Sequence, residues 1–133
     1  MIHYINIKTG ARVEFQDVTR RVMDIIASST IDSGVCHLFV PHTTAAVMIN
    51  EHADPDVVED IGAQLERLAP GRQAYRHAEG NSPAHIKASL IGPQKTVFIE
   101  DGRLQLGTWQ GIFFCEFDGP RNRSLMVKIV PDK

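Results

Sequence analysis

Residues 95–130, with the sequence KTVFIEDGRLQLGTWQGIFFCEFDGPRNRSLMVKIV, contain strand and turn signals and no helical pattern. Short runs rich in β-branched and aromatic residues alternate with turn residues such as Asp118-Gly119-Pro120. Four strands are predicted here, at 96–100, 103–106, 112–117 and 124–130. Consecutive strands joined by short turns indicate an antiparallel meander.

The earlier part of the chain adds further strands. Residues 2–8 and 11–15 alternate apolar and polar side chains around Thr9-Gly10, which predicts a hairpin. Residues 35–40 have the pattern of a buried strand. Residues 44–49 are apolar on both faces, as expected for a strand that is covered on both sides.

Helix signals lie between these strands. Three helix starts carry a capping residue, two of them followed by proline: Asp17, Asp54-Pro55 and Ser82-Pro83. Strands with helices interspersed, without strict alternation, predict the α+β class. We expect a mostly antiparallel β-sandwich or barrel-like sheet core with two to three helices, formed by residues 1–133 as a single domain.

The composition is that of an ordinary globular protein, with 43% hydrophobic and 23% charged residues. A formal net charge of -2, without a run of lysine or arginine, argues against nucleic acid or an anionic membrane as a partner. The N-terminus has no signal-peptide pattern, and no apolar run approaches the ~20 residues of a membrane span. We therefore expect a cytoplasmic protein in which Cys36 and Cys115 are reduced packing residues.

Three histidines are candidate metal ligands. His77 and His85 lie on either side of a turn that opens a helix, and His85 falls in the first helical turn, where the helix dipole favours neutral imidazole. His42 follows the buried strand 35–40, where a strand-end loop places functional groups. Three neutral imidazoles with an open position are typical of a catalytic zinc site. The alternative is that these histidines are hydrogen-bonded residues of the surface or core.

Several motifs follow one another over nearly the whole chain: Pro41-His42-Thr43-Thr44-Ala45, Ile49-Asn50-Glu51, Asp54-Pro55, Asp60, His77, Asn81, His85, Gly102-Arg103-Leu104, Gly107-Thr108-Trp109-Gln110 and Glu116-Phe117-Asp118-Gly119-Pro120-Arg121. In this order and spacing they resemble the YjbQ family, which is linked to a secondary thiamine-phosphate synthase activity.

The resemblance implies an α+β fold, assembly as a homotrimer and a divalent metal, commonly zinc, held by His42, His77 and His85. It also implies an enzyme that joins a pyrimidine diphosphate to a thiazole phosphate. The expected partner is therefore a small phosphorylated substrate.

Three further polar residues are candidates for catalytic roles. Glu51 and Asp60 suit a general base or a hydrogen-bond partner of a metal-bound imidazole, although Asp60 also fits a solvated helix face. Asn81 lies midway between His77 and His85 and either orients a bound group or stabilises the turn.

Four residues are candidates for substrate binding: Asn50, Trp109, Gln110 and Arg121. Between Gly107 and Gly111, an indole can stack on a heterocycle, but a lone Trp109 is also typical of a core. Arg121 and Arg123 either bind phosphate or are solvated residues of a polar turn.

Two other functions are compatible with the same residues. One is a metal-assisted hydrolase in which Glu51 or Asp60 takes a proton from metal-bound water. The other is a trimeric module that binds a small ligand without turnover.

Overall fold

The computed structural model describes residues 1–71 and 74–133 and confirms the predicted α+β class. The elements are, in chain order, β1 (Ile2–Lys8), β2 (Glu14–Asp17), α1 (Thr19–Ser29), β3 (Gly34–Phe39), β4 (Ala45–Glu51), α2 (Pro55–Leu68), α3 (Ser82–Ile91), β5 (Gln94–Glu100), β6 (Arg103–Leu104), β7 (Gln110–Glu116) and β8 (Asn122–Pro131). As predicted, Asp54 caps α2 by accepting a hydrogen bond from the amide of Asp56. In α3 the capping position is Asn81 rather than the predicted Ser82.

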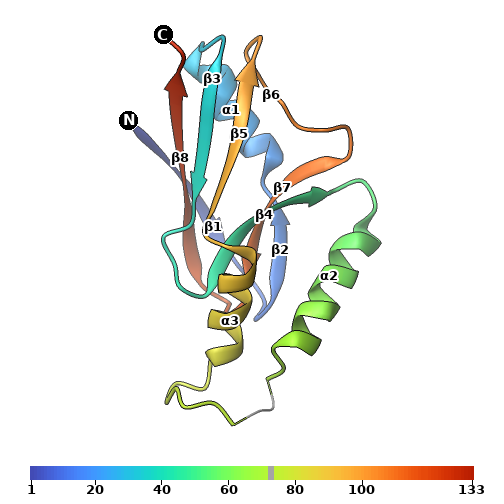
Figure 1. The fold of residues 1–133 in the computed structure, drawn as a ribbon. Helices are drawn as coiled ribbons and strands as arrows, with labels where there is room; N and C mark the ends of the chain where they lie inside the picture. The colour runs from blue at the N-terminus through green and yellow to red at the C-terminus, as the bar shows by residue number, and fades with distance from the viewer. Residues whose placement is uncertain (72–73) are drawn as a thin grey trace.

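The strands form two antiparallel sheets (Figure 1). One has the strand order β1-β8-β3-β5-β6, and the other has the order β2-β7-β4. The predicted hairpin of residues 2–8 and 11–15 is wrong, because β1 pairs with β8 and β2 pairs with β7. The predicted meander is wrong beyond the β5–β6 turn, because β7 and β8 lie in different sheets. Turn residues reverse the chain in a hairpin and in a crossover alike, so turn signals alone did not distinguish them.

The main core fills the space between the two sheets. Side chains alternate along each strand, so one face of every strand points inward. Buried residues of both sheets and of α1 meet there: Ile5, Ile7, Val18, Val22, Ile26, Cys36, Leu38, Val40, Ala45, Val47, Val97, Ile99, Ile112, Phe114, Leu125 and Val127. Burial of each large aliphatic side chain contributes roughly 1.5–3 kcal/mol, which makes this layer the main source of stability.

A second core lies on the other face of the three-stranded sheet, under α2 and α3. Its buried residues are Ala46, Met48, Leu65, Ala84, Ala88, Phe113, Cys115 and Phe117. This arrangement explains why residues 44–49 are apolar on both faces: β4 belongs to a sheet that is covered on both sides. The layers are therefore a five-stranded sheet, a three-stranded sheet and a pair of helices.

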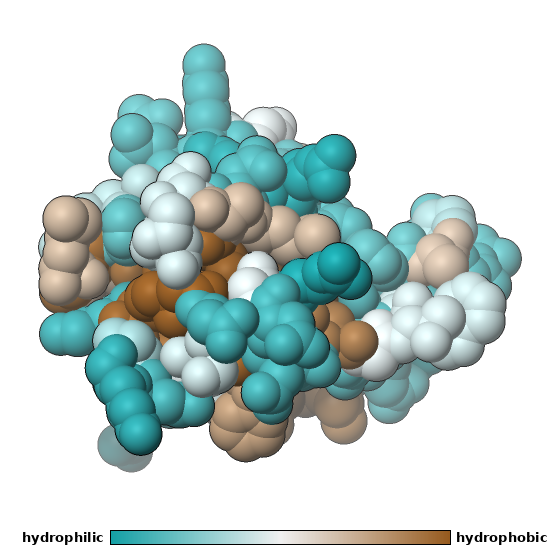
Figure 2. Space-filling view, turned by 90° about the horizontal axis from the view of Figure 1, so that it is seen from above, coloured by the Kyte–Doolittle hydropathy of each residue, from teal (hydrophilic) through white to brown (hydrophobic). Residues whose placement is uncertain are grey.

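The outer face of the five-stranded sheet is not covered by a helix of the described chain, and in Figure 1 α1 lies on its far side. Large apolar side chains project from this face, here named the open face: Ile2, Tyr4, Phe39, Phe98 and Val130. Tyr4 and Phe98 are 61% and 67% exposed. Seen from above, the molecule also exposes hydrophobic surface in a hollow surrounded by hydrophilic side chains (Figure 2).

A buried ion pair closes one end of the main core. Glu116 continues the inward row of Ile112 and Phe114 on β7, and Arg123 begins the inward row of β8. The Arg123 Nε donates to both Glu116 carboxylate oxygens, at 2.9 and 3.1 Å, and Thr9 Oγ1 donates to Oε1 at 2.7 Å. The pair thus connects the two sheets through charge-assisted hydrogen bonds.

The pKa of Glu116 reflects these contacts. Burial by itself raises the pKa, but hydrogen bonds from Arg123 and Thr9 outweigh it and hold the pKa below the ordinary value. Glu116 is therefore ionised at neutral pH and balances the charge of Arg123.

Both cysteines are buried and free, in agreement with the sequence prediction of packing thiols. Burial raises the pKa of the Cys36 thiol to about 11, so it is protonated at neutral pH. In the part of the chain that the structure describes, the helices are too short or too polar to cross a membrane.

We predict that Glu116→Gln lowers the free energy of unfolding at neutral pH by roughly 3–5 kcal/mol, because it leaves Arg123 buried without a counter-charge. Denaturant unfolding followed by circular dichroism would measure this. Glu59→Gln, on the exposed side of α2, is the matched control and should change little.

The same pair predicts a pH dependence. Because the pKa of Glu116 is lower in the folded chain than its ordinary value of 4.5, its stabilisation is complete above about pH 4.5 and is lost as the pH falls through the folded pKa. The stability difference between wild type and Glu116→Gln should therefore shrink in acid. A difference that stays constant on acidification would contradict this account.

Candidate functional site

Three histidines from separate segments line one cavity of about 420 Å³. His42 lies between β3 and β4, His77 lies in the segment before α3, and His85 lies in the first turn of α3. The three predicted ligands are therefore brought to the same hollow, here named the histidine cavity. Asn81 and Arg121, two other predicted site residues, also line it.

His77 and His85 lie against each other in this cavity. Their ring centroids are 5.2 Å apart and the rings are nearly perpendicular, at 88°. The Nε2 atom of His77 lies 4.0 Å from Oε1 of Glu79, a carboxylate that also lines the cavity. Two imidazoles and a carboxylate thus share one wall.

His42 is held by the backbone of β8. The amide of Ser124 donates a hydrogen bond to Nε2 of His42 at 3.0 Å. Partial burial, and next the positive charge of Arg123, hold the pKa of His42 below its usual value. His42 is therefore a neutral imidazole at neutral pH, with its proton on Nδ1.

The donor set suits zinc, which prefers imidazole nitrogen and accepts carboxylate oxygen. Within residues 1–71 and 74–133, however, no three such side chains already converge as a ligand set. The lone pair of His42 Nε2 is directed at the Ser124 amide. His42, His77 and His85 fit a zinc ion in chemistry, and His42 would have to exchange its hydrogen bond to bind one.

Asn81 connects the cavity to the loop after β7. Its Nδ2 donates to Asp118 Oδ2 at 2.9 Å, and Arg121 donates to the same carboxylate oxygen at 2.9 Å. Burial by itself raises the pKa of Asp118, but these hydrogen bonds outweigh it and the pKa is lowered. The Oδ1 atom of Asn81 is buried and has no hydrogen-bond partner among the described residues. That oxygen is available to a donor on a bound molecule.

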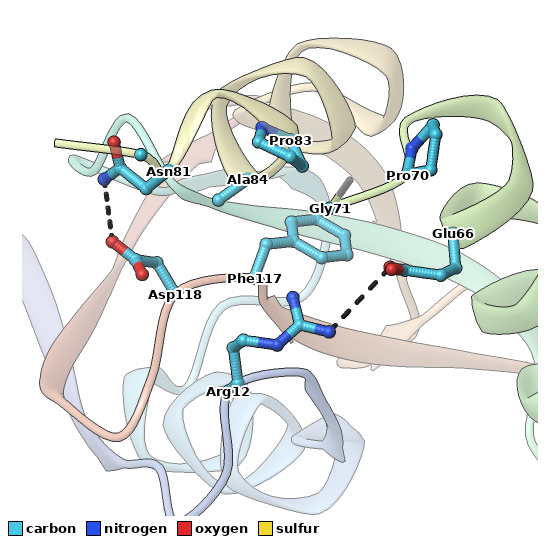
Figure 3. A pocket seen from close by; sticks show the side chains of 10 residues that line it. Arg12, Glu66, Pro70, Gly71, Asn81, Pro83, Ala84, Phe117 and Asp118 are labelled. Atoms are coloured by element: carbon cyan, nitrogen blue, oxygen red, sulfur yellow. Dashed lines mark hydrogen bonds and ion pairs between the residues drawn. The ribbon is translucent and has the colours of Figure 1, made fainter. Parts of the chain in front are cut away.

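A larger cavity of about 540 Å³ adjoins the histidine cavity and shares Asn81 and Asp118 with it (Figure 3). The buried ring of Phe117 lies between Asn81 on one side and the Arg12–Glu66 pair on the other, whose charged atoms are 3.9 Å apart. The two adjoining cavities can take a molecule with a polar group and an aromatic or apolar part.

Five predicted site residues do not line the histidine cavity in this chain: Asn50, Glu51, Asp60, Trp109 and Gln110. The first two end β4, which begins beside the cavity at Ala45. Seven residues of strand extend roughly 20 Å, so Glu51 lies at the far end of the sheet. Short-range sequence spacing gave no information on which strand end each motif occupies.

Two of these residues make hydrogen bonds to the backbone of adjacent turns. Glu51 accepts a hydrogen bond from the amide of Asp54, and Gln110 accepts one from the amide of Gly107. Trp109 is 62% exposed, so the alternative of a core residue is wrong. Asp60 lies on the exposed side of α2, in agreement with the solvated alternative.

The sequence interpretation missed the role of the Glu116–Arg123 pair beside His42. Arg123 was predicted to be either a phosphate ligand or solvated, but it is buried and its Nη2 donates to Thr44 Oγ1 at 2.7 Å. A usable signal was present: Glu116 is charged within an otherwise apolar strand, and a buried charge requires a partner.

The sequence of this chain matches that of a known protein family. A family model described as UPF0047 protein YjbQ-like matches residues 3–132. A UPF0047 protein of Methanocaldococcus jannaschii is 50% identical over 100% of this chain and 96% of its own length, and YugU of Bacillus subtilis is 46% identical over 98% and 99%.

Solved structures agree with this assignment. An uncharacterized YjbQ/UPF0047 protein of Clostridium acetobutylicum superposes with a TM-score of 0.94 at 48% identity, covering 96% of this chain and 99% of its own. A protein of unknown function from Sulfolobus solfataricus superposes with a TM-score of 0.95 at 33% identity, covering 99% and 97%. The chain belongs to the YjbQ/UPF0047 family.

Proposed function

We propose that this protein is a metal-dependent enzyme that acts on phosphorylated heterocycles and has thiamine-phosphate synthase activity. The observation that carries the proposal is the meeting of His42, His77 and His85 with Arg121 and Asn81 in one cavity. Imidazole nitrogens suit a divalent metal, and a guanidinium suits a phosphate.

The reaction makes two demands on such a site. A carbon–nitrogen bond forms between the pyrimidine methylene and the thiazole nitrogen, while the carbon–oxygen bond to diphosphate breaks and the diphosphate leaves with the electron pair. The site must therefore hold two heterocycles in contact and stabilise a growing negative charge.

Arg121 and α3 supply positive potential for the diphosphate. Two nitrogens of Arg121 are hydrogen-bonded to Asp118, but a guanidinium has five N–H groups, so others are free for phosphate oxygens. The N-terminal turn of α3 carries His85 at the cavity, and the positive end of a helix dipole favours phosphate.

The metal is proposed to be zinc, held by His42, His77 and His85, and it would act as a Lewis acid on a phosphate oxygen when bound. Burial, and next the charge of Arg123, lower the pKa of His42 and keep that ring neutral, and it would bind the metal once its hydrogen bond to Ser124 is exchanged. Asn81 Oδ1, without a partner in the described chain, would accept a hydrogen bond from an amino group on the substrate. The adjoining cavity offers space to one heterocycle.

We also propose that the protein is a homotrimer that assembles through the open face. Phe39, Phe98 and Tyr4 leave a broad apolar surface on the uncovered side of the sheet. Exposed apolar patches of this kind mark association surfaces. The open face extends toward the histidine cavity, because Ser124, which holds His42, lies on β8 beside this surface.

Metal analysis tests the site directly. We expect about one zinc per chain in protein purified without an affinity tag, with loss of the metal in His42→Ala, His77→Ala and His85→Ala. His52→Ala is the matched control, because His52 lies outside the cavity, and it should retain the metal. A wild type that stays free of zinc after zinc is offered would contradict the proposal.

Turnover is tested by mass spectrometry of the coupled product with the pyrimidine diphosphate and the thiazole phosphate as substrates. His85→Ala and chelation of the metal should each abolish product, and Arg121→Leu should reduce kcat/KM by about tenfold or more. Arg20→Leu, an exposed arginine of α1, is the control. Unchanged product formation in His85→Ala would exclude the proposed role of the cavity.

Association is tested by sedimentation velocity. Phe98→Asp places a charge on the open face and should convert trimer to monomer, because burying an unpaired carboxylate in an interface is unfavourable. Leu68→Asp alters a side chain of similar exposure on α2 and should leave the trimer intact. A monomeric wild type, or a Phe98→Asp variant that remains trimeric, would contradict assembly through this face.

A further inference from the structure

A second constellation of polar side chains lies at the opposite end of β4 from the histidine cavity. The Nδ1 atom of His52 is 2.8 Å from Oδ2 of Asp17, so the imidazole is oriented by a carboxylate. With Nδ1 occupied, Nε2 is the ring atom left for another molecule.

Asp17 is itself held by a chain of hydrogen bonds. Its Oδ1 accepts from the amide and the hydroxyl of Thr19, at 3.0 and 2.5 Å. Thr19 Oγ1 in turn accepts from the buried amide of Ile112 at 2.8 Å. One carboxylate oxygen therefore fixes the start of α1, and the other is left for His52.

The backbone beneath the imidazole also keeps this geometry. A Cβ atom added at Gly111 would lie 2.3 Å from His52 Nδ1 and 2.4 Å from Cγ, which is far inside contact distance. Only glycine at this position lets the ring lie against the strand. The His52 amide is bonded to the Trp109 carbonyl at 3.0 Å, which holds the residue to the same turn.

His52 lines a cavity of about 410 Å³ between α1 and the segment that follows β5. Its walls are mostly apolar side chains: Met23, Ile26, Ala27, Leu104 and Leu106. Both α1 and β6 lie toward the upper end of Figure 1, and the view from above shows hydrophobic surface in a hollow at that end (Figure 2). The volume lies within the range of small-molecule sites.

Two hydrogen-bond donors are left free at the border of this cavity. Arg103 has no ion-pair partner in the described part of the chain. Gln110 already uses its Oε1 to accept from Gly107, so its amide nitrogen remains. Thr19 Oγ1 both donates and accepts within the protein. A cavity with apolar walls and free donors at one side suits an anion with an apolar body.

We infer that this cavity binds a small organic monocarboxylate with an apolar chain or ring. The carboxylate lies against Arg103 and the amide nitrogen of Gln110, and the apolar body lies against α1 and Leu106. This site is separate from the proposed enzyme site and does not depend on it.

Binding is tested with phenylacetate as the probe and 2-phenylethanol as the neutral control, by titration into ¹⁵N-labelled full-length protein. Shifts should appear at the amides of His52, Leu104 and Gln110, with weaker binding of the alcohol. Arg103→Leu should weaken phenylacetate binding by about tenfold or more, because a charge-assisted contact is lost. Arg20→Leu, on the exposed side of α1, should bind as the wild type does.

Ala27→Phe provides a second variant, because Ala27 is exposed on the wall of the cavity and a larger side chain there fills it without entering the core. It should abolish binding while keeping a dispersed spectrum. His85→Ala should bind phenylacetate normally, which separates this inference from the proposed enzyme. Equal affinity for the alcohol, shifts centred on His42 and His85, or full binding by Ala27→Phe would each overturn the inference.

Discussion

The buried pair of Glu116 and Arg123 is the contact on which the arrangement of this molecule depends. The two charges come from β7 and β8, which lie in different sheets, and they meet where the inward rows of apolar residues end. A buried charge without its partner is strongly unfavourable, so each strand can occupy its place only if the other does. Thr9 adds the end of β1 to the same contact.

The ion pair also reaches the histidine cavity. Arg123 donates to the hydroxyl of Thr44, two residues after His42, and the next residue along β8 donates its amide to the His42 ring. The charge of Arg123 contributes to the lowered pKa of that ring. Burial remains the main cause of that lowered pKa, and the charge of Glu116 acts in the opposite direction. The contact that joins the sheets therefore adjoins one proposed metal ligand.

The sequence predicted the elements of the fold better than their pairing. Capping residues and turn residues act over a few positions, so Asp54 and the strand starts were found close to their observed places. The pairing of β2 with β7 joins segments about a hundred residues apart, and no local pattern encodes it. The hairpin and meander predictions failed for this reason.

For the candidate site as well, the sequence predicted individual residues better than their positions relative to one another. His42, His77 and His85 were identified because each follows a strand or opens a helix, and such positions place side chains at a common edge of the fold. Glu51 was assigned to the same site although a whole strand separates it from His42. Glu51 is close to His42 in the sequence, but it is the last residue of β4 and therefore lies at the other end of the sheet.

The antiparallel pair of β4 and β7 therefore has two polar ends with an apolar middle, and each end borders a cavity. This separation limits the chemistry available at the histidines. Among the described residues, the carboxylates that line that cavity are Glu79 and Asp118, and Asp118 is held by Asn81 and Arg121. A carboxylate base acting on a molecule bound there would be Glu79 or, in the proposed trimer, a carboxylate of another copy of the chain.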